Sequence, residues 1–219
     1  MRSLIFVRPI RRKAFTLTTL YALKPRFQAL LRPLTRGLAA AGITANQVTV
    51  AAAVGSVIAG AVVALVGQDR PAALLLLPVW LLVRMALNAI DGMLAREFSQ
   101  KSALGAYLNE LGDVMSDAAL YLPIAVVAPF TLLGMTAVVL LAGVSELAGA
   151  LAAAVGATRR YDGPMGKSDR ALLFGALGAW VGLGGAVPGW FAWLPYAVAV
   201  LIAVNVVNRV RAGIAESRS

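Results

Sequence analysis

The hydrophobic positions of this chain fall into long runs that short polar segments separate. Six such runs occupy residues 46–67, 72–95, 103–127, 129–155, 169–187 and 190–210. Each is close to the ~20 apolar residues that a helix needs to cross a bilayer. The pattern therefore predicts an all-α membrane protein with six transmembrane helices.

A shorter segment before the first run has a different periodicity. Its apolar side chains lie on one helical face, and basic side chains occupy the rest. The apolar face consists of Phe27, Leu30, Leu31, Leu34 and Leu38. We expect an N-terminal amphipathic helix over 25–38 that lies on the membrane surface and is kinked at Pro33. The predicted domains are a basic cytoplasmic arm with this interfacial helix (1–43), a six-helix membrane domain (44–212) and a cytoplasmic tail (213–219).

The composition supports a membrane protein and narrows its chemistry. The chain is 60% hydrophobic and 14% charged, with a mean hydropathy of +0.80. It contains neither cysteine nor histidine. Disulfides, thiolate chemistry, histidine metal sites and Ser-His triads are therefore excluded. A bound metal would need oxygen ligands, which favours Mg²⁺, Mn²⁺ or Ca²⁺.

The net charge of +10 is unevenly distributed along the chain. Nine of the 20 basic residues precede residue 40, and the first acidic residue is Asp69. An acid-poor arm of this kind resembles a transit peptide, but beside an amphipathic segment we interpret it as binding anionic lipid headgroups and not nucleic acid. The loops near 96–102 and 156–168 and the tail are also basic, so both termini and both loops are expected to be cytoplasmic.

Polar side chains interrupt the second and third hydrophobic runs with helical spacing. On the second run they share one face with two small residues: Asn88, Asp91, Gly92 and Ala95. On the third run they recur every four residues: Gly105, Asn109, Asp113 and Asp117. Carboxylates are expensive in lipid and tend to face a cavity, a partner or an ion. Two such faces predict a site for a divalent metal and a phosphate, open to the cytosol.

Cations lie close to this predicted site. Arg96 is either a membrane-surface anchor or a phosphate clamp beside the metal. Lys167 and Arg170 flank an expected helix N-cap at Ser168 or Asp169, which suits a phosphate but also a purely topological role. Arg84 is the expected partner of buried carboxylates, and Glu146 is expected either to pair with Arg84 or to have a polar packing role.

Several of these residues also match a long motif, D-x2-D-G-x2-A-R-x8-G-x3-D-x3-D. The positions that match are Asp91-Gly92, Ala95-Arg96, Gly105 and Asp113. Asn88 and Asn109 stand at the first and third Asp of the motif. With six runs, a basic arm and a T-x-N-x-x-T start to the first run, the chain resembles the CDP-alcohol phosphatidyltransferase superfamily, in a bacterial inner-membrane subgroup.

The resemblance implies transfer of a phosphatidyl or related group from a CDP-linked donor to an acceptor alcohol, with release of CMP. CDP-diacylglycerol is the expected donor. The resemblance implies Mg²⁺ or Mn²⁺, one ion or two, bound by Asp91 and Asp113 with Asn88 and Asn109. Asp113 matches the position of the catalytic base, and we expect Asp117 to support the ligands without binding the metal.

The resemblance also assigns substrate contacts. The positions that match contacts to the CDP part are Thr44, Asn46, Gln47, Gly92, Arg96 and Ser102. Lys167 and Arg170 resemble residues that receive the phosphate of a phosphorylated acceptor. Thr44 or Asn46 would serve equally as a helix N-cap.

Other interpretations of the chain remain open. The small-residue pair Gly178 and Gly182 favours packing within the chain over a homodimer seam. The two Asn substitutions leave open a catalytically impaired relative that binds CDP and lipid. The intramembrane carboxylates leave open a small cation-coupled transporter.

Overall fold

The structure, a computed structural model, describes residues 24–218, and all of the regular structure in this range is helical. The α-helices are α1 (Lys24–Ala40), α2 (Ala45–Val66), α3 (Leu76–Glu97), α4 (Ala103–Tyr121), α5 (Leu132–Ala154), α6 (Lys167–Gly182) and α7 (Leu194–Ser217). Short 3-10 segments adjoin three of them: η2 (Pro71–Leu75), η3 (Leu122–Val126) and η4 (Gly189–Trp193). The all-α prediction is confirmed for this range, and the first part of the predicted basic arm lies outside it.

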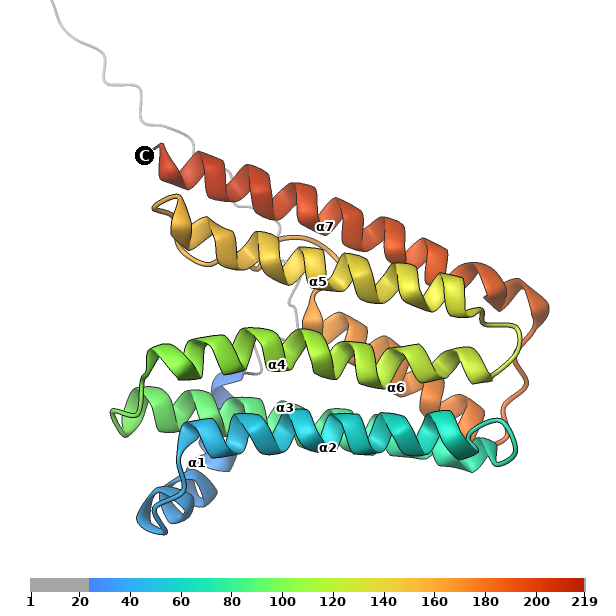
Figure 1. The fold of residues 1–219 in the computed structure, drawn as a ribbon, viewed down its shortest axis with the longest axis horizontal. Coiled ribbons are helices and arrows are strands. Elements are labelled where there is room, and N and C mark those ends of the chain that lie inside the picture. Colours follow the sequence, from blue (N-terminus) through green and yellow to red (C-terminus); the bar gives the residue numbers. More distant parts are fainter. Residues whose placement is uncertain (1–23, 219) are drawn as a thin grey trace, which may run out of the picture.

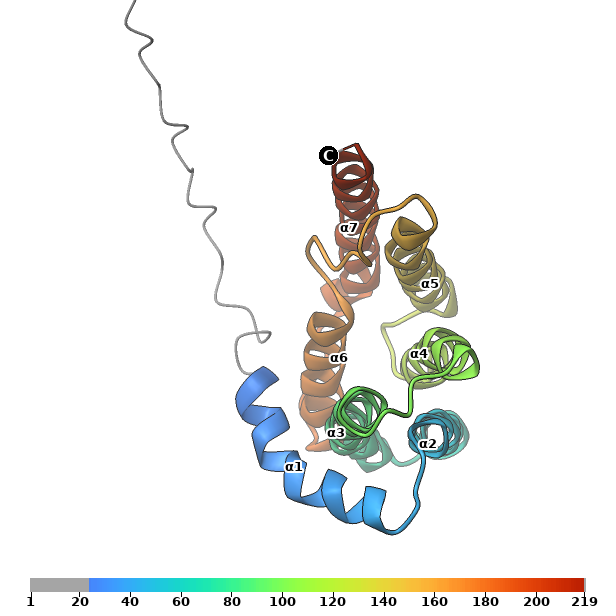
Figure 2. The same ribbon diagram turned by 90° about the vertical axis from the view of Figure 1, so that its left-hand side faces the viewer.

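The helices form a bundle with one helix across its end. α2 packs against α3 and α4, α4 also contacts α5, α5 packs against α7, and α6 packs against α3 (Figure 1). The loops after α3 and α5 and the C-terminal end lie at one end of the bundle (Figure 1). α1 crosses this end and contacts α3 (Figure 2).

α1 spans the segment 25–38 where the amphipathic helix was expected, and it continues as one helix through Pro33, where a kink was expected. Arg32 on α1 donates to Glu97 at the end of α3, with an Nη2–Oε1 distance of 2.9 Å. This pair holds the interfacial segment beside the last turn of α3. The position of α1 on a membrane surface stays a prediction.

The membrane-spanning prediction is confirmed for part of the bundle. Within residues 24–218, four helical stretches are long and apolar enough to cross a membrane: Ala45–Val66, Pro71–Glu97, Leu132–Ala154 and Gly189–Ser217. α6 has only 16 residues, and α4 carries Glu110, Asp113 and Asp117 within its 19 residues. α6 begins part-way along the bundle, as Figure 1 shows, and so covers only part of its length. The bundle has the expected six helices after α1, whereas six crossings stay a prediction.

Glycines permit close helix contacts inside the bundle. A Cβ atom added at Gly60 on α2 would overlap the carbonyl group of Ala119 on α4. Gly178 and Gly182 on α6 face residues of η2 and the start of α3, where a Cβ at Gly178 would lie 2.9 Å from the carbonyl oxygen of Leu74. The two α6 glycines therefore pack within the chain, as the sequence favoured.

Candidate active site

The site begins where α2 starts, after the turn that follows α1. Thr44 is the N-cap: its hydroxyl accepts from the backbone N–H of Gln47 at 3.2 Å, and the Gln47 side chain accepts from the Thr44 N–H at 2.8 Å. This reciprocal capping box fixes the first turn of α2. The N-cap expected at Thr44 or Asn46 is therefore confirmed at Thr44.

The loop between α3 and α4 is fixed to the same turn. Gln100 Oε1 accepts from the backbone N–H of Ala45 at 2.7 Å. Two residues on, the Ser102 hydroxyl caps α4 by accepting from the N–H of Gly105 at 2.9 Å. These bonds bring the N-terminal ends of α2 and α4 beside the C-terminal end of α3.

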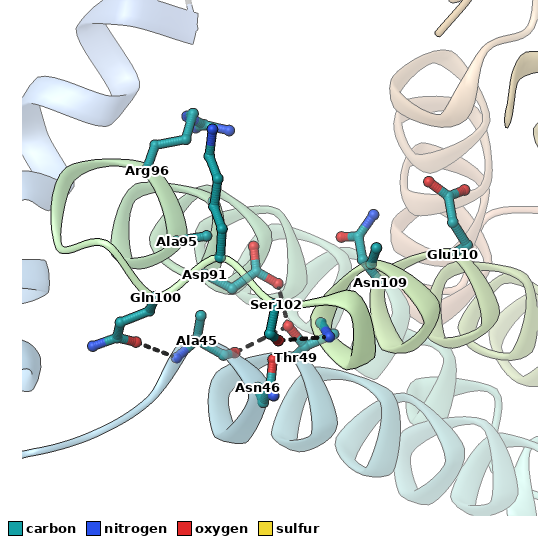
Figure 3. A pocket seen from close by; sticks show the side chains of 14 residues that line it. Ala45, Asn46, Thr49, Asp91, Ala95, Arg96, Gln100, Ser102, Asn109 and Glu110 are labelled. Atoms are coloured by element: carbon teal, nitrogen blue, oxygen red, sulfur yellow. Dashed lines mark hydrogen bonds between the residues drawn. The ribbon is translucent and has the colours of Figure 1, made fainter. Parts of the chain in front are cut away.

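A pocket of ≈ 380 Å³ lies between these three helix ends (Figure 3). Its lining consists of Ala45, Asn46, Thr49, Asp91, Gly92, Ala95, Arg96, Gln100, Lys101, Ser102, Gly105, Ala106, Asn109 and Glu110. Arg96 and Lys101 supply two positive charges, and neither forms an ion pair with any residue of 24–218. Cations together with two helix N-termini make a favourable site for a phosphate or pyrophosphate.

Two of the lining glycines are needed for the shape of the pocket. A Cβ atom at Gly105 would lie 2.7 Å from Oδ1 of Asn46, which is closer than real side chains approach. A Cβ atom at Gly92 would lie 3.0 Å from Nη2 of Arg96. The glycines therefore leave room for Asn46 and Arg96 at the walls of the pocket.

Asp91 is the buried carboxylate of this pocket. The Thr49 hydroxyl lies 2.8 Å from Oδ2 of Asp91 and 3.0 Å from the carbonyl oxygen of Ala45, so the single hydroxyl proton is shared between these two acceptors. Thr49 thus orients the Asp91 side chain from the neighbouring helix (Figure 3). The sequence pattern contained the threonine but did not predict this contact.

Asp113 lies on α4 and meets cations from two other helices. Its Oδ1 accepts from Lys167 at the start of α6, from Arg84 Nη2 at 3.4 Å and from Asn88 Nδ2 at 3.5 Å. No residue within 24–218 donates to its Oδ2. One oxygen of this carboxylate is therefore held in place while the other is left for a ligand or a proton.

The expected metal ligands offer a suitable set of donors. Asp91 and Asp113 supply carboxylate oxygens, and Asn88 and Asn109 can supply amide oxygens, all from the facing helices α3 and α4. Oxygen ligands of this kind fit Mg²⁺ or Mn²⁺. Within residues 24–218, however, no three acidic side chains gather into a metal-binding group, because amides replace two of the motif's carboxylates.

A buried ionic network lies behind Asp113. Arg84 donates to Asp117 at 2.6 Å, and Arg170 donates to the other oxygen of Asp117 at 2.9 Å and to Glu146 at 3.3 Å. Of the two roles expected for Glu146, pairing with Arg84 or polar packing, the pairing with Arg84 is wrong, since Arg170, Arg159 and Arg209 bind Glu146. Arg84 is instead held by Asp113 and Asp117, which lie one turn apart on α4.

The structure separates the two cations that were expected to receive an acceptor phosphate. Lys167 contacts Asp113 and its side chain is 27% exposed, whereas the Arg170 side chain is fully buried. A direct contact between Arg170 and a ligand would require Arg170 to leave Asp117 and Glu146. α6 also begins earlier than expected, with Gly166 as N-cap and the Asp169 carboxylate accepting from its N–H at 3.1 Å.

The other predicted site residues divide into two groups. Asn46, Asp91, Gly92, Arg96, Ser102 and Asn109 meet at the pocket. Thr44 and Gln47 cap α2 and are not among its lining residues, so their contact with CDP stays a prediction. The sequence did not predict Gln100 and Lys101 as site residues, because the motif leaves the residue types of the α3–α4 loop unspecified. Only the folded chain brings this loop to α2.

Comparison with known proteins agrees with this site. The family model for CDP-alcohol phosphatidyltransferase matches residues 42–208, a range that includes the whole pocket and the ionic network as far as Lys167 and Arg170. The chain therefore belongs to the CDP-alcohol phosphatidyltransferase family.

Individual relatives add to this assignment. The chain is 44% identical over 200 residues to "Inner membrane protein YnbA" of Escherichia coli (strain K12), a match that covers 88% of this chain and 95% of that protein. A crystal structure of the Mycobacterium tuberculosis phosphatidylinositol phosphate synthase PgsA1 in complex with manganese and citrate shares the fold, with a TM-score of 0.67, 20% identity and coverage of 83% and 88%. The same enzyme with CDP-DAG bound gives a TM-score of 0.61 at 20% identity, with coverage of 85% and 92%.

Proposed function

We propose that this protein transfers a phosphatidyl group, or a related substituted phosphate, from a CDP-linked donor to the hydroxyl of an acceptor alcohol and releases CMP. CDP-diacylglycerol is the donor that we favour, because PgsA1 with CDP-DAG bound has the same fold. The observation that carries the proposal is the pocket at the meeting point of α2, α3 and α4. Asp91, Gly92, Arg96 and Gly105 of the family's motif line it, and neither Arg96 nor Lys101 forms an ion pair with a residue of 24–218.

Donor binding follows from the pocket lining. Arg96 and Lys101 offset the charge of the pyrophosphate, and the first turns of α2 and α4 add the partial positive charge of their N-termini. Gly92 and Gly105 let the phosphate chain approach the helix backbones closely. Ser102 and Asn46 provide hydrogen-bonding groups for the nucleotide.

The transfer step needs one proton acceptor. In the proposed reaction the acceptor oxygen attacks the phosphorus atom that carries the lipid, and the bond from that phosphorus to the phosphate oxygen of CMP breaks. CMP leaves with the electron pair of that bond, and Asp113 takes the hydroxyl proton on Oδ2. Lys167, Arg84 and Asn88 fix Oδ1 of Asp113, so the free oxygen is held in one orientation for this transfer.

We further propose that a divalent cation, Mg²⁺ or Mn²⁺, is held by Asp91 and Asp113 with the amides of Asn88 and Asn109. When bound, the ion would neutralise charge that develops on the leaving CMP. Asp117 acts from behind these groups, since it holds Arg84, which in turn donates to both the carboxylate and the backbone carbonyl of Asp113. This arrangement would position Asp113 without a direct contact between Asp117 and the ion.

For the cellular location, we propose the bacterial inner membrane, with the termini and the pocket towards the cytosol. Two observations support this orientation: a relative is named an inner membrane protein, and the basic loops after α3 and α5 lie at the pocket end of the bundle.

The reaction can be tested by measuring CMP release from CDP-diacylglycerol by the purified protein, with Mg²⁺ or Mn²⁺ and a panel of alcohols. Asp113→Asn keeps the shape of the side chain but removes the base, so we expect the rate to fall by about 100-fold or more. Asp69→Asn is the matched control, because Asp69 is exposed at the opposite end of α2. Full activity of Asp113→Asn would exclude Asp113 as the base.

A second candidate is a relative that binds the CDP donor but does not turn it over. The amides at Asn88 and Asn109, which leave only two motif carboxylates, favour it. Binding of CDP-diacylglycerol without CMP release, for every alcohol and metal tested, would support this candidate over the transferase.

A further inference from the structure

The basic residues beside Asp113 and Lys167, the side of the site that the family resemblance links to the acceptor, are paired with carboxylates; we call it the acceptor side. Apart from the Arg32–Glu97 pair on α1, the ion pairs within residues 24–218 join six cations to six carboxylates. The cations are Arg84, Arg159, Arg160, Lys167, Arg170 and Arg209, and the carboxylates are Glu110, Asp113, Asp117, Glu146, Asp162 and Glu216. We call these twelve side chains the paired-charge cluster. Its positive and negative groups are equal in number.

Each buried cation of the paired-charge cluster is held by a carboxylate. The side chains of Arg84, Arg170 and Arg209 are 3%, 0% and 2% exposed, and each contacts a carboxylate that is itself almost fully buried. Removing one partner from such a pair leaves an uncompensated buried charge, which is strongly unfavourable. These arginines therefore stay with their carboxylates when a substrate arrives.

The accessible cations of the paired-charge cluster are paired as well. Arg159, Arg160 and Lys167 have side chains that are 22%, 23% and 27% exposed. Arg159 is bound by Glu110 and Glu146, and Arg160 is bound by Asp162 at 2.8 Å and by Glu216 at 2.5 Å. Hydrogen bonds to Asp162 and Glu216 also raise the pKa of Arg160 above its ordinary value.

The donor pocket has the opposite arrangement. Arg96 and Lys101 line it without an ion pair to any residue of 24–218, which leaves their charge available to a pyrophosphate. The two sides of the site thus differ in how their cations are used. On the donor side the charge is free for the substrate, and on the acceptor side the protein's own carboxylates already neutralise it.

On the basis of the proposed transferase function, we infer that the acceptor is an uncharged alcohol that carries several hydroxyl groups, and not a phosphorylated alcohol. A phosphate dianion would have to displace carboxylates from Lys167 or Arg159 and would then lie beside the displaced negative charges. A hydroxyl group both donates and accepts, so it can bond to a carboxylate and a guanidinium of one pair without disturbing their charge balance. The partly exposed Glu110–Arg159 pair offers both kinds of group next to the donor pocket.

The test compares matched acceptors in the CMP-release assay with the full-length protein, CDP-diacylglycerol and Mn²⁺. The pairs are glycerol against glycerol 3-phosphate and inositol against inositol 1-phosphate. We expect kcat/KM to be higher for the uncharged member of at least one pair by about tenfold or more, equivalent to ~1.4 kcal/mol. Equal or better use of the phosphorylated members would overturn the inference.

Two variants connect this preference to the paired-charge cluster. Glu110→Gln and Glu146→Gln each remove one carboxylate from Arg159, so each should shift the ratio of kcat/KM towards the phosphorylated acceptor. Glu97→Gln is the control, because Glu97 pairs with Arg32 outside the cluster, and its ratio should match the wild type. A wild-type ratio in both folded cluster variants would count against the inference.

A direct binding measurement distinguishes failure of the inferred acceptor class from failure of the proposed transferase function. Radiolabelled glycerol and glycerol 3-phosphate can be compared by equilibrium binding to the protein with CDP present, where no turnover is needed. Preferential binding of the uncharged alcohol without CMP release would retain the acceptor class while contradicting the transferase. Binding of the phosphorylated alcohol alone, or failure to bind or use either uncharged alcohol, would overturn the acceptor class whatever the turnover.

Discussion

At the scale of single residues, the centre of the site combines two carboxylates with two amides. Asp91 and Asp113 carry the negative charge, while Asn88 and Asn109 contribute neutral oxygens at positions where the family motif has Asp. Lys167 further reduces the net negative charge of the site, because its ammonium group contacts Asp113. A site with so little negative charge should bind a divalent ion weakly, and we expect one ion rather than two.

This expectation gives a prediction for metal affinity. The double variant Asn88→Asp/Asn109→Asp should tighten Mn²⁺ binding, on the order of tenfold for each added carboxylate, because affinity in oxygen sites rises with ligand charge. Electron paramagnetic resonance of free Mn²⁺ in a titration measures this affinity independently of activity. Asn208→Asp, which adds a charge on α7 outside the site, should leave the affinity unchanged, and an unchanged affinity in the double variant would refute the ligand assignment.

The motif identified most residues of this site, but it did not predict which residues contact one another. Asp91, Gly92, Arg96 and Gly105 line the pocket, whereas Asn88 and Asp113, which share the predicted helix faces, are not among its lining residues. The bond from Gln100 to Ala45 and the contact of Lys167 with Asp113 join residues 55 and 54 positions apart in the chain. No local period encodes such contacts, because they depend on how the helices pack.

At the scale of elements, the hydrophobic runs located the helices but not their ends. The run over 72–95 becomes η2 followed by α3, and the run over 103–127 becomes α4 followed by η3. Pro71 and Pro123 stand at the start of these two 3-10 segments. A proline lacks the N–H that would continue an α-helix, so the hydrophobic pattern continues where the α-helical hydrogen bonding does not.

The packing of α2 against α4 places Thr49 and Asn46 opposite the α4 wall of the pocket. Gly60 on α2 allows the two helices to approach each other closely. Gly60→Ala should force the two helices apart, because its Cβ would overlap the carbonyl group of Ala119. We expect a loss of stability of about 1–3 kcal/mol, typical of overpacking. The four tryptophans allow the thermal unfolding midpoint to be followed by intrinsic fluorescence.

Gly189→Ala provides the control for this prediction. No atom lies within 4 Å of the position that a Cβ would take at Gly189, so its unfolding midpoint should stay near that of the wild type. An equal midpoint for Gly60→Ala and Gly189→Ala would show that α2 and α4 can separate without cost.

At the scale of the whole molecule, the distribution of charge predicts the orientation in the membrane. The chain has no cysteine, so single cysteines can be introduced at opposite ends of the bundle. Ser217→Cys at the end of α7 should react with a membrane-impermeant maleimide only after cells are lysed. Gln68→Cys after α2 should react in cells whose outer membrane alone has been permeabilised. The reverse labelling pattern would invert the proposed topology.

All residues that line the donor pocket lie between positions 45 and 110, whereas five of the six cations of the paired-charge cluster lie at 159 and beyond. The two halves of the chain thus have different duties, but Glu110, Asp113 and Asp117 of the first half pair with Arg159, Lys167 and Arg170 of the second. A chimera that keeps residues 1–131 and takes its remaining helices from a relative that retains these three cations should retain the nucleotide specificity while adopting a new product. Such exchange offers a modular route by which one ancestral scaffold could diversify the headgroups of membrane lipids.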